Sequence, residues 1–225
     1  MTKTIRFVLG IVLIVPLLLS APLAVLAATP TPSSTSAQQQ QDTANAAANT
    51  QQAANIKKTL AQRVAAIKAT YKSVVTAQQA ANIKSKCATA QTAVSSVSNK
   101  LSDNIALRAD VYNSLLSNLD STIAKLKNAS VPSTDLTAER NLLNSKIAGF
   151  SIDAASYKLS LSDLRSLDCA SDPVAFQAVL EAARGHLTVI SADATGIRQY
   201  VTDTIEPTLK LTSQGLSSAK TSGGQ

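Results

Sequence analysis

Two segments in the second half of the chain repeat an apolar residue at alternating steps of four and three positions. The first covers residues 136–164, with Arg140 as its one charged member, and the second covers 176–201. Apolar residues at this period share one face of an α-helix, and a stripe of four or more heptads is typical of a coiled-coil or long-bundle seam. The two stripes therefore predict long helices near 134–167 and 172–206.

A similar stripe follows residues 83–126 and predicts a helix near 79–128, and a shorter one predicts a helix near 51–76. Nine residues separate Val74 from Ile83, a step that turns the stripe to the opposite helix face. No Gly or Pro marks a break there, so the pattern leaves open whether 51–128 is one helix or two. The heptapeptide QQAANIK occurs twice, starting at Gln51 and at Gln78, which indicates a local duplication.

Composition supports a helical fold. Aromatic residues make up 3% of the 225 residues and there are seven glycines, too few for the strands and turns of sheet proteins. Short loops between long helices place neighbours antiparallel. We expect an all-α antiparallel bundle of three to four long helices with coiled-coil seams over 51–206. We also expect a disordered Pro/Ser/Gln/Ala spacer over 28–50, with the alternative that helix begins inside its Ala-rich end, and a disordered tail over 207–225.

The N-terminus has the layout of a secretory signal peptide. Lys3 and Arg6 precede an apolar run, and small residues favour cleavage after Ala27. The alternative is an uncleaved membrane anchor, although Pro16 and Pro22 interrupt the run. We predict a protein exported across the cytoplasmic membrane, to the periplasm, the cell surface or the medium.

Two cysteines, Cys87 and Cys169, are predicted to form a disulfide in such an oxidising compartment. If residues 79–128 and 134–167 form a hairpin, position 87 lies opposite a position near 174 or 175. Cys169 is within about 8 Å of that level at 1.5 Å per residue. The alternative is two buried free thiols.

Basic and acidic residues are separated along the chain. No acid lies between Asp42 and Asp103, whereas residues 103–225 hold 13 acids and 11 bases. This basic stretch predicts a docking face for an anionic envelope polymer or membrane surface. Its alternative role is to pair with the acidic half inside the bundle. The candidate docking residues are Lys57, Lys58, Arg63, Lys68, Lys72, Lys84 and Lys86.

No pattern in the sequence predicts catalysis, and we predict no catalytic, cofactor-binding or metal-binding residues. Nucleophile-elbow, phosphate-loop and zinc-protease motifs are missing, and His186 is the single histidine. Acid pairs such as Asp163 with Asp168, or Asp193 with Asp203, are interpreted as solvated helix faces. Tyr71 is the one aromatic residue in the basic stretch, which disfavours sequence-specific nucleic-acid binding.

The sequence thus predicts an exported, non-enzymatic helical bundle that acts as a structural or interaction module at the cell envelope or outside the cell. The chain resembles small exported helical proteins of microbial envelopes in general, and no motif assigns it to a named family. The partner is an unidentified protein or an anionic envelope polymer, with self-association through the helical seams as a further possibility. The alternative function is an amphipathic binder of membranes or other anionic or hydrophobic surfaces through residues 51–102.

Overall fold

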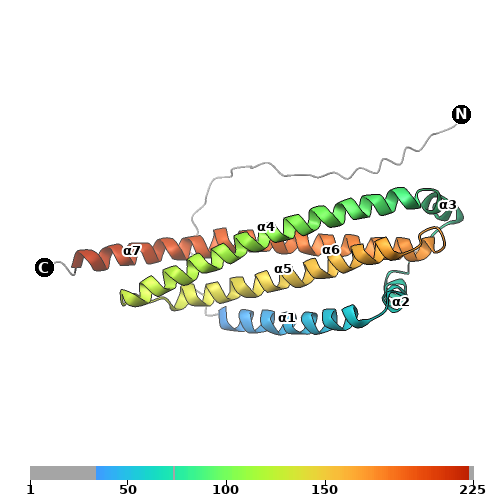
Figure 1. Ribbon diagram of the computed structural model, residues 1–225. Coiled ribbons are helices and arrows are strands. Elements are labelled where there is room, and N and C mark those ends of the chain that lie inside the picture. Colours follow the sequence, from blue (N-terminus) through green and yellow to red (C-terminus); the bar gives the residue numbers. More distant parts are fainter. Residues whose placement is uncertain (1–33, 73, 223–225) are drawn as a thin grey trace, which may run out of the picture. The chain divides into compact units, whose positions relative to one another are not determined.

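The computed structural model describes residues 34–72 and 74–222 (Figure 1). Every element of regular secondary structure in these residues is a helix, which confirms the predicted all-α bundle. The predicted signal peptide, residues 1–27, lies outside the described residues. The elements are α1 Ser34–Lys57, α2 Leu60–Tyr71, α3 Ala77–Ser85, α4 Cys87–Asn128, α5 Thr134–Ser166, α6 Pro173–Tyr200, the π-helical turn η1 Val201–Ile205 and α7 Glu206–Ser222.

Helix α5 is the centre of the bundle, since α1, α4 and α6 all pack against it. Cross-contacts show that α4 and α5 run antiparallel: Asp120 binds Arg140 near their shared loop, and Cys87 binds Cys169 at the far end. The turn between α5 and α6 is short, so α6 returns along α5 in the same way (Figure 1). Arg140, the charged exception in the apolar stripe, is explained by its pair with Asp120, at 2.8 Å.

The predicted stripes form the core. The fully buried side chains come mainly from α4, α5 and α6, and Tyr112 packs edge-on against Phe150 with ring centroids 5.5 Å apart. Aromatic contacts of this geometry add to the free energy gained by burial. Coiled-coil packing of the seams stays a prediction. Large buried side chains of the core include Leu119, Leu126, Leu136, Leu143, Phe150, Leu161, Leu164, Phe176, Val179, Ile197 and Ile205.

The prediction of a disordered spacer over 28–50 is wrong from residue 34 onward, where α1 begins. Its Ala and Gln residues favour helix, and it docks on α5 through polar contacts, among them a 2.7 Å hydrogen bond from Asn45 Nδ2 to the Ser145 carbonyl. Gly149 permits this approach, because a Cβ there would lie 3.2 Å from Asn45 Oδ1. Helix α1 is therefore attached by polar groups and small residues, with few large apolar side chains.

The predicted helices 51–76 and 79–128 are also wrong in their boundaries. The chain breaks after Lys57, after Tyr71 and at Lys86, which gives α2, α3 and α4 as separate helices. Thr59 and Thr76 each cap the following helix by accepting a hydrogen bond from the backbone N–H of the glutamine three residues later. The side chain of that glutamine accepts a hydrogen bond from the backbone N–H of the threonine. Such reciprocal caps define helix starts where no Gly or Pro is present.

The predicted disordered tail over 207–225 is wrong for residues 207–222, because helix continues past Pro207 as α7. A proline inside an α-helix clashes with the carbonyl four residues earlier. The π-helical turn η1 accommodates it by widening the backbone, so that Glu206 N–H bonds the Val201 carbonyl. Thr208 then ties α7 to α5 through a 2.7 Å hydrogen bond to Glu139.

Candidate functional site

The main candidate site is the segment of residues 56–86, called here the connector, which joins α1 to α4 through α2 and α3. It contains all seven predicted docking residues and no acid. Helices α2 and α3 both pack against α6. The structure therefore places these basic residues along one connected segment on the bundle, and it divides them into two groups.

The first group binds acidic side chains of the bundle, and Arg63 belongs to it. Its Nε lies 2.9 Å from Asp163 Oδ2 and its Nη2 2.5 Å from Asp163 Oδ1, while Nη1 donates to the Lys58 carbonyl. The hydrogen bond to Asp163 raises the pKa of Arg63. Asp163 is 2% exposed, so this is a buried bidentate pair between α2 and α5 and not a solvated face. Arg63 is consequently engaged within the bundle.

Lys68 also binds the bundle, through an ion pair at its surface. Its Nζ lies 3.4 Å from Asp172 Oδ2, and Asp172 at the same time caps α6 by accepting a 2.9 Å hydrogen bond from Ala175 N–H. This pair is more exposed than the Arg63 pair and contributes less to stability. Both pairs join the basic stretch to the acidic half of the chain, as its alternative role predicts.

Lysines of the second group are exposed. Within the described residues, none of them forms an ion pair, although Lys58 donates a 3.0 Å hydrogen bond to Asn55 Oδ1. Because their charges are not neutralised, these lysines keep a positive potential at the connector surface. They are Lys57, Lys58, Lys72, Lys84 and Lys86.

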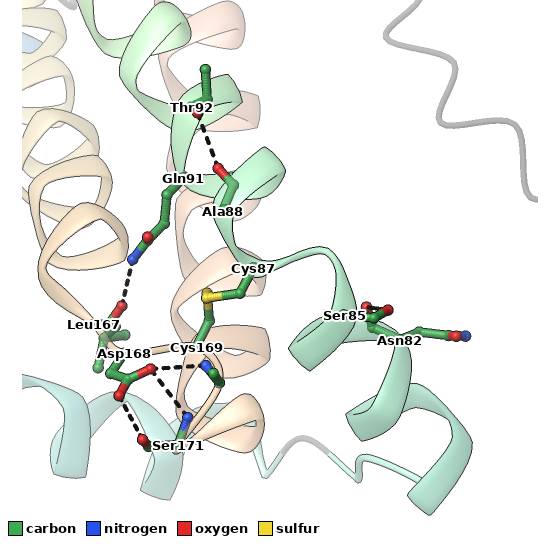
Figure 2. The surroundings of a disulfide bond; sticks show 11 residues. Asn82, Ser85, Cys87, Ala88, Gln91, Thr92, Leu167, Asp168, Cys169 and Ser171 are labelled. Carbon is green, nitrogen blue, oxygen red and sulfur yellow. Dashed lines mark hydrogen bonds between the residues drawn. A yellow bond between two sulfur atoms is a disulfide. The ribbon is translucent and has the colours of Figure 1, made fainter.

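The predicted disulfide closes the C-terminal end of the connector. Cys87 and Cys169 are paired with a Cα separation of 5.6 Å, and no free cysteine remains in the described residues. Figure 2 shows the bond beside a 2.8 Å hydrogen bond from Gln91 Nε2 to the Leu167 carbonyl. The disulfide thus holds the joint between α3 and α4 against the α5–α6 turn.

The α5–α6 turn has its own polar framework. Asp168 accepts hydrogen bonds from the Ser171 hydroxyl and from the backbone N–H groups of Ser171 and Ala170 (Figure 2). The bonds from Ser171 and then Ala170 lower the pKa of Asp168. The turn that carries Cys169 is therefore organised by a charged side chain as well as by the disulfide.

A second candidate site is a cavity of about 370 Å³ between α1, α5 and α6. Asp153 of α5 and Asp193 of α6 line it beside Lys146. Asp193 Oδ2 is buried and receives no hydrogen bond from the described residues. Burial and the neighbouring Asp153 raise the pKa of Asp193 to about 6, since two carboxylates can share a hydrogen bond only when one is protonated. Sequence reasoning missed this pair, because Asp193 faces Asp153 and not Asp203.

Two further side chains of α6, His186 and Tyr200, have shifted pKa values. Burial lowers the pKa of His186, an effect that Asp153 opposes. Burial, and then the charge of Glu139, raise the pKa of Tyr200 to about 12, and Lys146 Nζ lies 5.4 Å from the Tyr200 ring centroid. No signal in the sequence joins these residues, because their contacts depend on the register between α5, α6 and η1.

Among the described residues, no group of three or more His, Cys, Asp and Glu side chains is placed to hold a metal ion. None of their helices is long and apolar enough to cross a membrane. Comparison of the chain with protein-family models, with curated proteins and with solved structures finds no significant match.

Proposed function

We propose that this protein is an exported, non-enzymatic helical bundle that serves as an interaction module, and that its connector docks on an anionic component of the cell envelope. The observation that carries this proposal is the group of five exposed connector lysines without an ion-pair partner in the described residues. A segment of 31 residues with seven bases and no acid attracts polyanions over a Debye length.

The bundle gives this segment a fixed support. Arg63 anchors α2 to α5, Lys68 anchors it to the start of α6, and the Cys87–Cys169 bond anchors the end of α3. Immobilised charges lose less conformational entropy on binding than charges on a flexible chain. The disulfide and the signal-like N-terminus support export to an oxidising compartment.

Co-sedimentation of the natively purified, oxidised protein with envelopes from the source organism tests the proposal. We expect binding at low salt that is lost at about 0.5 M salt, where screening acts within a few ångströms. Replacing Lys57, Lys58, Lys84 and Lys86 by Gln is expected to abolish it. The matched control replaces four exposed lysines outside the connector by Gln, namely Lys100, Lys125, Lys127 and Lys210. Absence of binding at every salt concentration, or equal binding by both variants, would refute the proposal.

A further inference from the structure

Exposed apolar side chains accompany the connector lysines. Val74 is 88% exposed and Ile56 61%, and Tyr71 is also exposed. Ile56 directly precedes Lys57 and Lys58, while Tyr71 and Val74 flank Lys72. Apolar groups exposed together and rimmed by charge are typical of interaction sites on proteins. The connector therefore presents two neighbouring kinds of group, ammonium ions and apolar side chains.

The joint between α2 and α3 holds one of these clusters outward. Lys72 ends α2 in a left-handed conformation, with φ 40° and ψ 41°, and its N–H bonds the Lys68 carbonyl at 3.1 Å. Thr76 starts α3 four residues later with its reciprocal cap. Because Val74 lies between these two helix ends, its side chain is left without helical neighbours and almost fully exposed.

Tyr71 sets this joint against the bundle. A Cβ atom at Gly185 of α6 would lie 3.1 Å from the Tyr71 hydroxyl oxygen, so the side chain of Tyr71 reaches across to α6. At the other end of α2, Arg63 binds Asp163. Both ends of α2 are thus held by the bundle. Ile56, Lys57 and Lys58 lie at the end of α1 and in the joint before α2, and Lys72 and Val74 lie in the joint after α2.

We propose that the connector binds the surface of an anionic lipid bilayer, with its lysines at the headgroup phosphates and with Ile56 and Val74 in the interfacial layer. This inference rests on the proposed function and names its partner. A soluble polyanion offers phosphate or carboxylate charge but no apolar phase, so it leaves the two apolar side chains in water. A bilayer satisfies both kinds of group. The closed bundle binds without opening, since the contact needs only the joints.

Vesicle co-sedimentation measures this interaction. We expect the native, oxidised protein to bind vesicles of phosphatidylcholine with about 30% phosphatidylglycerol and not pure phosphatidylcholine vesicles. Lys57→Gln with Lys58→Gln is expected to weaken binding about 25-fold, or about fivefold per lysine. Ile56→Ser with Val74→Ser is expected to weaken it at least about tenfold by removing apolar burial. Circular dichroism and a thiol assay establish that each variant keeps its helix content and disulfide.

Matched control variants test whether the effect depends on where the lysines and apolar residues lie or only on their removal. Lys125→Gln with Lys127→Gln removes the same charge from α4, and Leu107→Ser with Val111→Ser removes two exposed apolar side chains of α4. Both controls are expected to bind anionic vesicles as the native protein does. Equal weakening by a control and its connector counterpart would refute a specific role for the connector.

A second probe distinguishes lipid from soluble polyanion. Binding to polyphosphate is expected to weaken when the lysines are replaced and to stay unchanged in Ile56→Ser with Val74→Ser. If the apolar variant binds anionic vesicles as well as the native protein does, Ile56 and Val74 do not enter the interfacial layer, and the inference that distinguishes a bilayer from a soluble polyanion is overturned. If envelopes bind the protein but anionic vesicles do not, this inference fails while the proposed function stands.

Discussion

Asp193→Asn is predicted to make the protein more stable at neutral pH and to flatten the dependence of its stability on pH. In the native protein, burial and the adjacent Asp153 raise the pKa of Asp193 from 3.8 to about 6. The folded state therefore binds a proton that the unfolded chain releases between about pH 4 and pH 6. The free energy of unfolding falls as the pH rises through this window, because the folded state must ionise a partly buried carboxyl group.

The size of the effect follows from the shift. A change from 3.8 to about 6 corresponds to about 3 kcal/mol at 1.36 kcal/mol per pH unit. Solvent reaches part of the pair and screens the repulsion, so about 1 to 2 kcal/mol is expected at pH 7.5. An asparagine keeps the side-chain shape and donates a hydrogen bond to Asp153 at every pH, so it removes this penalty.

Urea unfolding followed by circular dichroism between pH 4 and pH 7.5 measures the difference. We expect the variant to exceed the native protein by about 1 to 2 kcal/mol at pH 7.5, with the difference shrinking toward pH 4. Asp203→Asn removes an exposed carboxylate from the adjoining turn η1 and is the matched control for the loss of one acid. Parallel curves for the native protein and Asp193→Asn, or a less stable variant at pH 7.5, would contradict the reasoning.

Three other changes test the contacts that hold the bundle together. Cys87→Ser with Cys169→Ser opens a covalent loop with a sequence separation of 82 and is expected to lower the free energy of unfolding by roughly 4 kcal/mol, measured in urea; an unchanged midpoint would refute this. Arg63→Ala leaves Asp163 buried without its partner and is expected to lower the free energy of unfolding by about 3 to 5 kcal/mol at pH 7. The double variant Arg63→Met with Asp163→Leu is expected to recover most of that loss. Equal stability of the single and double variants would argue against a buried pair. Gly149→Ala places a Cβ 3.2 Å from Asn45 Oδ1 and is expected to increase hydrogen exchange in α1 while leaving α6 unchanged; unaltered exchange in α1 would show that the helix does not dock there.

The long helices could be predicted from the sequence because large apolar residues mark them. Leu136, Leu143 and Phe150 recur at helical spacing and are buried in α5 as expected. The cysteine pairing was also predictable, since a hairpin about the loop after α4 brings residues 87 and 169 to nearly the same level.

Helix boundaries in the connector were missed for a specific reason. No Gly or Pro lies at these boundaries, whereas Thr59 with Gln62 and Thr76 with Gln79 form reciprocal caps that are readable as Thr-x-x-Gln. These two motifs were available in the sequence. The two copies of the duplicated heptapeptide occupy different places in the fold, because the first copy ends α1 and the second copy lies in α3.

Other features of the molecule depend on tertiary contacts and leave no local signal. Helix α1 has no apolar stripe, and its docking requires Gly149 and the Ser145 carbonyl of α5. The inward direction of Arg63 depends on Asp163, which is 100 residues away. Sequence periodicity alone could not divide the connector bases into anchors and exposed lysines.

That separation of 100 residues has a consequence during synthesis. Asn45 pairs with Ser145 and Arg63 with Asp163, each across 100 residues. At about 5 to 20 residues per second, α1 and α2 leave the ribosome about 5 to 20 seconds before their partners exist. A nascent segment with a large apolar face would be exposed to aggregation for that interval. The Ala, Gln and Asn composition of α1 leaves this helix without such a face, and its attachment to α5 uses polar contacts instead.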